Sequence, residues 1–213
     1  MNTLRTLIAG ARRTVLFAAA AVLLATAALA QSPPAQDEAK VKAGFLLRFA
    51  QFVAWPEEAL PQPDTPLVVG LAGAEGIAGD LSQQAVTSRA TLGRPVIVRT
   101  VKVGDDVSAL HVLFVGMEER LRIAQYAGAI RGEHILLVTE SPGALDQGSM
   151  INFVVADRRV KFEIALDTAE KAGLVLSSRL LAVAIRVLKS ELRMLAYPVA
   201  SAAALRVPAG VRE

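Results

Sequence analysis

The chain of 213 residues contains no cysteine. This absence excludes a disulfide, a thiol nucleophile, a thiolate metal site and a cysteine redox switch. Histidine is also scarce, because only His111 and His134 are present, and neither has a second ligand at metal-binding spacing. We interpret both as core or strand-edge histidines. The fold therefore has to rest on its hydrophobic core, for which an apolar fraction of 53% is ample.

The known sequence signatures of catalysis are missing as well. The glycines of GLAGAEG, at positions 70, 73 and 76, lack the close pair of the dinucleotide fingerprint, and close packing explains them better. No serine lies in a G-x-S-x-G turn, and no carboxylate pair has a spacing typical of acid–base work. We therefore expect no enzyme, no cofactor and no metal.

The first thirty residues have the pattern of a secretory signal peptide. Arg5, Arg12 and Arg13 precede an uncharged run of 17 residues that ends in Ala28-Leu29-Ala30. That run is shorter than the roughly 20 residues of a membrane-spanning helix, which argues against the alternative of a permanent anchor. We expect cleavage after residue 30 and a periplasmic protein, exported by the general or the twin-arginine route.

An excess of charge is absent once this peptide is removed. The peptide holds three of the 23 basic residues and no acidic one, so the mature chain has 20 basic and 20 acidic residues. No block of like charge occurs. Nothing in this balance indicates nucleic acid or an anionic membrane as a partner.

The mature sequence predicts a single α/β domain over residues 40–197, between a flexible leader (31–39) and a loose tail (198–213). A helix over 41–55 is expected to turn Val41, Phe45, Phe49 and Phe52 inward, at steps of four and three. Continuous apolar runs predict buried strands within 67–73, 94–102, 109–116 and 134–140, with helices over 74–86 and 117–132. This order indicates a layered, mostly parallel sheet flanked by helices, with a C-terminal β-hairpin.

The hairpin is predicted in MINFVVADRRVKFEIAL, residues 150–166. One register places three apolar pairs on one face, which a slip of one residue would destroy: Val155 with Val160, Phe153 with Phe162, and Ile151 with Ile164. The same register puts Asn152 opposite Glu163 on the other face. The charged residues 157–159 then form a polar tip and not a binding site.

The C-terminal part predicts a short helix from Thr168 to Gly173 and a longer one capped by Ser177 or Ser178. The longer helix would carry an apolar seam of Leu181, Ile185, Leu188, Leu192 and Leu195. Arg179, Arg186 and Arg193 would form a basic ridge on another face. Such a helix could dock on its own core, form a homodimer or lie on a membrane surface.

Several segments together resemble the YfiR family of exported proteins. They are VKAGFLLRFAQFVAWP, LVVGLAG, GRPVIVRTV, HVLFVG, GSMINFVVADRRVKFEIAL and AEKAGLVLSSRLLAVA, and they occur in family order over about residues 41–184. Two features depart from the family pattern. Cysteines that the family often carries are replaced in the regions of Val69, Gly70 and Leu110, so both ends of a presumed bridge are missing, and Ser149 stands for a usual glycine.

The resemblance implies a non-enzymatic periplasmic regulator that binds and represses an inner-membrane diguanylate cyclase, which limits cyclic-di-GMP synthesis and biofilm formation. It also implies sequestration by an OmpA-like outer-membrane lipoprotein. A periplasmic small-ligand sensor, with its pocket at the carboxyl ends of the parallel strands, is the alternative. As partner contacts we select Asn152 and Glu163 on the outer face of the hairpin and the basic ridge Arg179, Arg186 and Arg193. Ordinary solvation or internal hydrogen bonding is the competing interpretation.

Overall fold

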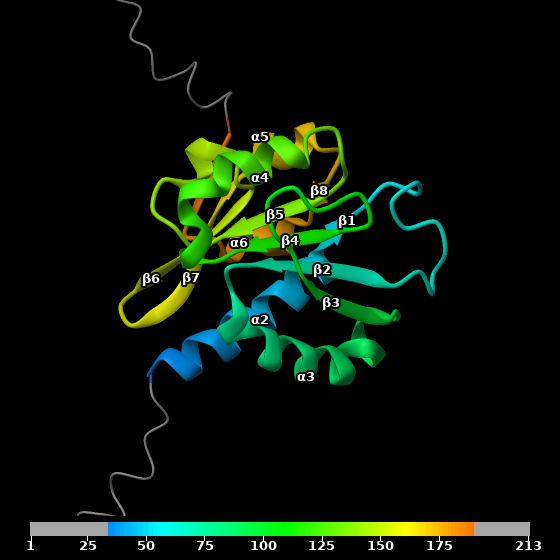
Figure 1. Ribbon diagram of the computed structural model, residues 1–213, viewed down its shortest axis with the longest axis horizontal. Helices are drawn as coiled ribbons and strands as arrows, with labels where there is room; N and C mark the ends of the chain where they lie inside the picture. The colour runs from blue at the N-terminus through cyan, green and yellow to red at the C-terminus, as the bar shows by residue number, and fades with distance from the viewer. Residues whose placement is uncertain (1–33, 190–213) are drawn as a thin grey trace, which may run out of the picture.

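The computed structural model describes residues 34–189 as a sheet with helices on both faces (Figure 1). The expected signal peptide, the whole predicted tail (198–213) and Arg193 lie outside these described residues. The larger sheet has seven strands in the order β3-β2-β4-β5-β6-β7-β9. All neighbours are parallel except β6 and β7, which form the hairpin. The predicted α/β class is confirmed.

The strands of this sheet are β2 (Leu67–Ala72), β3 (Val96–Thr100), β4 (Val112–Val115), β5 (Leu136–Thr139), β6 (Ile151–Ala156), β7 (Arg159–Ala165) and β9 (Arg186–Leu188). A second, two-stranded sheet pairs β1 (Val53–Ala54) with β8 (Val175–Leu176). The helices are α2 (Pro34–Phe52), α3 (Glu75–Leu92), α4 (Ile123–Ala129), α5 (Leu166–Lys171) and α6 (Ser178–Val183), with 3-10 turns η1 (Met117–Arg122) and η2 (Ala144–Gln147). No described helix is both long and apolar enough to cross a membrane.

The two faces of the sheet bury separate apolar clusters. On one face, α2 and α3 pack on strand residues such as Val69, Phe114 and Val138. On the other face, α4 packs Ile123 and Tyr126 against neighbouring positions of the same strands. The central strands are continuous apolar runs because both of their faces are covered.

Helix α2 is longer than the sequence indicates. It begins at Pro34, so most of the segment expected as a flexible leader is helical. Phe45 and Phe49 point inward as predicted, whereas Val41 is 44% exposed. The buried position beside it belongs to Lys42, which lies in line with the fully buried Leu46 and Phe49.

The predicted long C-terminal helix is wrong. Ser177 caps α6 as expected, with its side chain accepting from the Leu180 amide. The helix ends at Val183, Ala184 takes extended backbone, and the chain adds β9 to the sheet beside β7. Pairing with β7 satisfies backbone groups that a helix would have satisfied internally, and Ile185 and Val187 are β-branched residues suited to extended backbone. The described chain therefore offers no helical seam for a homodimer, and Leu192 and Leu195 lie beyond it.

The hairpin register is confirmed at every predicted pair, from Ile151–Ile164 to Val155–Val160. The turn contains only Asp157 and Arg158, with φ values of 53° and 58°. This is the left-handed geometry of the two-residue turns that favour Asn-Gly. Neither residue is glycine, so the turn carries backbone strain.

His111 is a buried link between a loop and the sheet. Its Nδ1 accepts from the Val68 amide at 3.1 Å, and its Nε2 donates to the Ala59 carbonyl at 3.0 Å. Burial lowers the pKa of His111 from its usual 6.5; the bond to Ala59 opposes this shift and the charge of Arg94 adds to it. The neutral ring is the form that can accept from Val68. The interpretation of His111 as a core histidine is confirmed.

Replacing Arg158 with glycine is expected to raise the free energy of unfolding by up to about 1 kcal/mol, because glycine adopts positive φ without a steric penalty. Arg159→Gly removes the same charge one residue later, in regular strand backbone, and should lower the stability instead. Urea unfolding of both variants measures the difference. Equal changes in the free energy of unfolding of the two variants would contradict the claim that the backbone at Arg158 is strained.

Stability is expected to fall with acidification. The folded protein binds a proton at His111 less readily than the unfolded chain, so this contribution is complete above pH 6.5 and is lost as the pH falls below that value. Urea unfolding at about pH 7.5 and about pH 5.5 measures the loss. His111→Asn retains an acceptor but does not titrate, and it should flatten the dependence. An unchanged slope in that variant would assign the effect to other groups.

Candidate functional site

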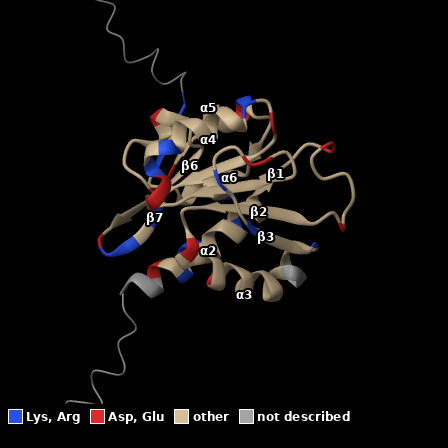
Figure 2. Cartoon of the chain, viewed as in Figure 1, with Lys and Arg blue, Asp and Glu red and all other residues tan. Residues whose placement is uncertain are grey.

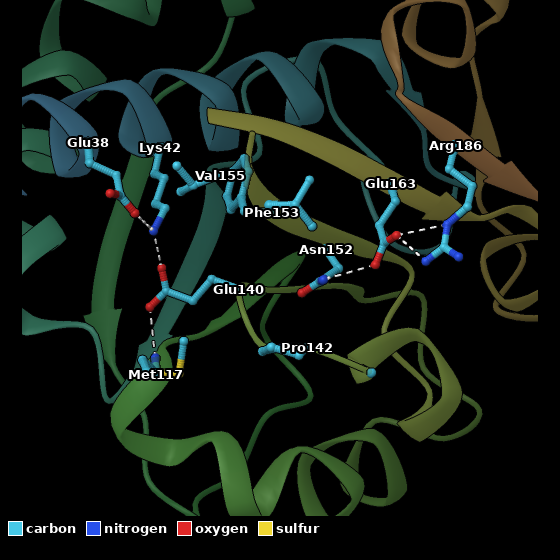
Figure 3. Close-up of a pocket in the computed structure, with 12 residues that line it drawn as sticks. Glu38, Lys42, Met117, Glu140, Pro142, Asn152, Phe153, Val155, Glu163 and Arg186 are labelled. Carbon is cyan, nitrogen blue, oxygen red and sulfur yellow. Dashed lines mark hydrogen bonds and ion pairs between the residues drawn. The ribbon is translucent and has the colours of Figure 1, made fainter. Parts of the chain in front are cut away.

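A groove of about 650 Å³ opens where β4 and β5 end at their carboxyl edges (Figure 3). Met117 follows β4 and Glu140 follows β5, while α2, β6, β7 and β9 supply the other walls. Its charged lining residues are Glu38, Lys42, Glu140, Glu163 and Arg186. The carboxyl edge of parallel strands is the usual ligand position in α/β folds. This groove is the candidate site.

One polar network joins α2 to the loops after β4 and β5. Lys42 bonds Glu38, one helical turn earlier, and also Glu140. The second carboxylate oxygen of Glu140 accepts from the Met117 amide at 2.8 Å. Burial acts to lower the pKa of Lys42, but the bonds and charges of Glu140 and Glu38 outweigh it and raise that pKa above 10.5. Lys42 is therefore a charged brace across the groove.

A second network runs across the sheet through β5, β6, β7 and β9. The Thr139 hydroxyl lies 2.7 Å from Asn152 Oδ1 and 2.8 Å from Ser149 Oγ, and the Asn152 amide donates to Glu163 at 3.1 Å. Arg186 completes the line by donating to the other oxygen of Glu163 through Nε, at 2.9 Å, and through Nη2. Figure 3 shows Asn152, Glu163 and Arg186 in this order.

The hydrogen-bonding capacity that remains in the groove lies on its two cations. Both oxygens of Glu140 and both oxygens of Glu163 are already bonded, whereas Lys42 and Arg186 retain protons for further acceptors. No serine, histidine or cysteine lines the groove. Within residues 34–189, no three His, Asp or Glu side chains are grouped to hold a metal ion.

The structure brings together three of the five residues selected from the sequence. Asn152, Glu163 and Arg186 form one network, but Asn152 is only 1% exposed and Glu163 only 7%. The expected exposure of this pair is therefore wrong, because the two side chains bond each other inside the protein, and their contact with a partner stays a prediction. Arg179 is exposed on α6, outside the groove, and Arg186 lies on β9, so these two arginines do not share a helix as predicted.

The sequence reasoning missed Lys42, Glu38 and Glu140. The sequence did contain an indication for Lys42, because it lies four residues before Leu46 and seven before Phe49, on the buried face of the helix. A lysine there must either pair with a carboxylate or move that face away from the core. Glu140 follows a buried strand, at the edge where polar residues of α/β folds gather.

The glycines of GLAGAEG serve packing in part. A side chain at Gly73, with φ of +57°, would meet the Glu119 backbone at 2.9 Å, but Gly76 faces open space.

Comparison with protein families finds a match over residues 39–185 to the family described as YfiR/HmsC-like. A search of curated proteins finds no match. Among solved structures, the chain is similar to the crystal structure of a conserved domain protein from Vibrio cholerae O1 biovar El Tor, at 15% identity and a TM-score of 0.44. That similarity covers 62% of this chain and 57% of the other.

Charges of both signs are dispersed over the described chain (Figure 2).

Lys42→Met is expected to lower the free energy of unfolding by about 1–3 kcal/mol, because Glu140, whose side chain is 14% exposed, would lose its counter-ion. Lys161→Met is the matched control, since Lys161 pairs with an acid four residues away at an exposed position. It should change stability little. Urea unfolding compares the two, and equal losses would contradict a bracing role for Lys42.

Proposed function

This chain belongs to the YfiR/HmsC-like family, and from that membership we propose that it is a non-enzymatic regulator that binds and represses an inner-membrane diguanylate cyclase. Repression would take place in the periplasm, where the expected signal peptide directs the chain. By restraining cyclic-di-GMP synthesis, the protein would limit biofilm formation. An OmpA-like outer-membrane lipoprotein is the proposed sequestering partner.

The construction of the groove supports a binding role. Its carboxylates are held in ion pairs and it lacks a free nucleophile, while its two cations still have protons to donate. Arg186 is the most accessible of these groups, with 57% of its side chain exposed. Such a surface recognises polar groups of a partner without transforming them.

The experiment is co-purification of the mature chain with the periplasmic region of a co-encoded diguanylate cyclase, together with cyclic-di-GMP measurement after gene deletion. We expect a complex and a rise in cyclic-di-GMP. No binding, combined with an unchanged nucleotide level, would refute the proposal.

Arg186→Gln is expected to weaken the complex about tenfold or more, because Arg186 lines the groove and bonds Glu163. Arg179→Gln removes the same charge from an exposed position on α6 outside the groove and should leave affinity unchanged. Titration calorimetry measures both, and circular dichroism confirms that both variants are folded. Equal affinities for the two variants would exclude the groove as the contact.

A second function, a small-ligand sensor, is favoured by one observation. The groove has the volume of an ordinary small-molecule pocket and lies at the carboxyl ends of parallel strands. Thermal-shift screening against metabolites distinguishes the two, since a ligand that binds only the folded protein raises its melting temperature. A flat response across the screen would count against the sensor.

A further inference from the structure

The outer half of β6 is an open sheet edge. The pairing of β5 with β6 consists of Val138–Ile151 and Thr139–Asn152, and β5 ends there. Strand β6 continues to Ala156. From Phe153 onward, β6 has β7 on one side and no strand among the described residues on the other. Figure 1 shows the hairpin extending beyond the rest of the sheet.

The backbone groups of Val155 point to this open side. In an antiparallel pair, residues alternate between those that bond the partner strand and those that point away. A two-residue turn makes Ala156–Arg159 a hydrogen-bonded pair. The amide of Ala165 donates to the carbonyl of Met150, so the bonded positions on the β6 side are the even-numbered ones. The Phe162 carbonyl accepts from the amide of Ile185, the residue before β9, so it faces away from β6. Val155, an odd-numbered residue of β6 like Phe153, therefore directs its amide and carbonyl away from β7.

The candidate groove runs along this same edge. Phe153, Val154 and Val155 line it, with Lys42 and Glu140 on the facing wall (Figure 3). Val155 is 58% exposed and Met117 is 43% exposed, so the edge carries apolar surface beside unpaired backbone. Proteins usually protect such an edge with a lysine, a proline or a bulge. No proline or bulge interrupts β6 between Ile151 and Ala156.

The charges of the groove complement a basic segment. Three carboxylates line it, those of Glu38, Glu140 and Glu163, against the two cations Lys42 and Arg186. Both oxygens of Glu140 and of Glu163 are bonded, but Glu38 bonds Lys42 through one oxygen, and its side chain is 37% exposed. A lysine or arginine entering beside α2 would therefore find an accessible carboxylate.

We propose that the open edge of β6 binds an extended segment of a protein partner, which adds a strand beside Phe153–Ala156. The segment places an apolar side chain over Val155 and a basic one toward Glu38. Side chains of an added strand alternate between the α2 side and the side of Asn152 and Arg186, which gives the site its selectivity. An extended backbone satisfies the outward amide and carbonyl of Val155 together, which a helix cannot do. The identity of the partner, though not the edge site itself, rests on the proposed function.

Amide hydrogen exchange, followed by NMR on the mature chain, tests the site. In the free protein, the amide of Val154 should exchange slowly and that of Val155 fast, because only the first is bonded to β7. Synthetic peptides chosen from a displayed library of random extended sequences are then added. Binding peptides should slow the Val155 amide by about tenfold or more and leave Val154 unchanged. Peptides that bind without slowing Val155, or a library that yields no binder, would overturn the proposal.

The periplasmic region of the diguanylate cyclase provides a second probe that separates the two proposals. A complex with a slowed Val155 amide supports both. A complex in which Val155 still exchanges freely retains the regulator function and overturns the edge site for this partner. If no complex forms, the regulator proposal fails and the peptide experiment alone decides the edge. In the free protein, the exchange of the Val155 amide could also slow as the protein concentration rises. That result would show that a second copy of the chain binds the edge, and it would overturn the proposal of a different partner.

Val155→Pro removes the outward amide without removing a bond to β7, and should reduce peptide affinity about tenfold or more. Val155→Thr is the matched control, since it keeps the amide and the β-branched shape, and it should retain most of the affinity. Equal losses in both variants would assign binding to the side chain and overturn strand addition. If the Val155→Pro variant fails to fold, the amide exchange rates in the unmodified protein decide.

A metabolite provides a further test of the groove. If it raises the melting temperature and displaces the peptide while the Val155 amide still exchanges freely, the groove binds a small ligand and the proposal is overturned.

Discussion

The contact between α2 and the β6–β7 hairpin, made by phenylalanine rings, is the interaction on which the site depends. Phe45 and Phe49 of the helix meet Phe153 and Phe162 of the hairpin, with ring centroids 5.0 to 5.9 Å apart. These rings bury a large apolar area and hold the helix at one position along the hairpin. Lys42 precedes Phe45 by one turn, so the same contact sets it over the end of β5 and defines one wall of the groove.

The parts of the fold that could be predicted from sequence are those in which one pattern leaves a single arrangement. Three apolar pairs fixed the hairpin register, because a slip of one residue would turn all of them outward. The C-terminal region failed for the opposite reason. Its apolar spacing suits a helix, but β-branched residues such as Val187 also suit a strand, and only the presence of β7 decides between them. A local pattern cannot contain that information.

The candidate site was only partly predictable, for a related reason. Alternation correctly put Asn152 and Glu163 on the face opposite the phenylalanines, but it did not show that this face is covered. A sheet with layers on both sides has no solvent-facing surface at its centre, so polar residues there must find partners inside the protein. Lys42 and Glu140 are 98 residues apart and meet only because α2 crosses the sheet. Their pairing is a property of the tertiary fold.

The ion pair between Glu163 and Arg186 has a consequence for the minimum length of the chain. Glu163 lies on β7, but its counter-ion comes 23 residues later, on the last strand of the sheet. A nascent or proteolysed chain that stops before Arg186 contains the whole hairpin and yet leaves the nearly buried carboxylate of Glu163 without its cation, which is expected to lower the stability of the sheet. The pair therefore ties the last described strand to the hairpin, because a shortened chain would keep the bond from Asn152 to Glu163 but lose the cation.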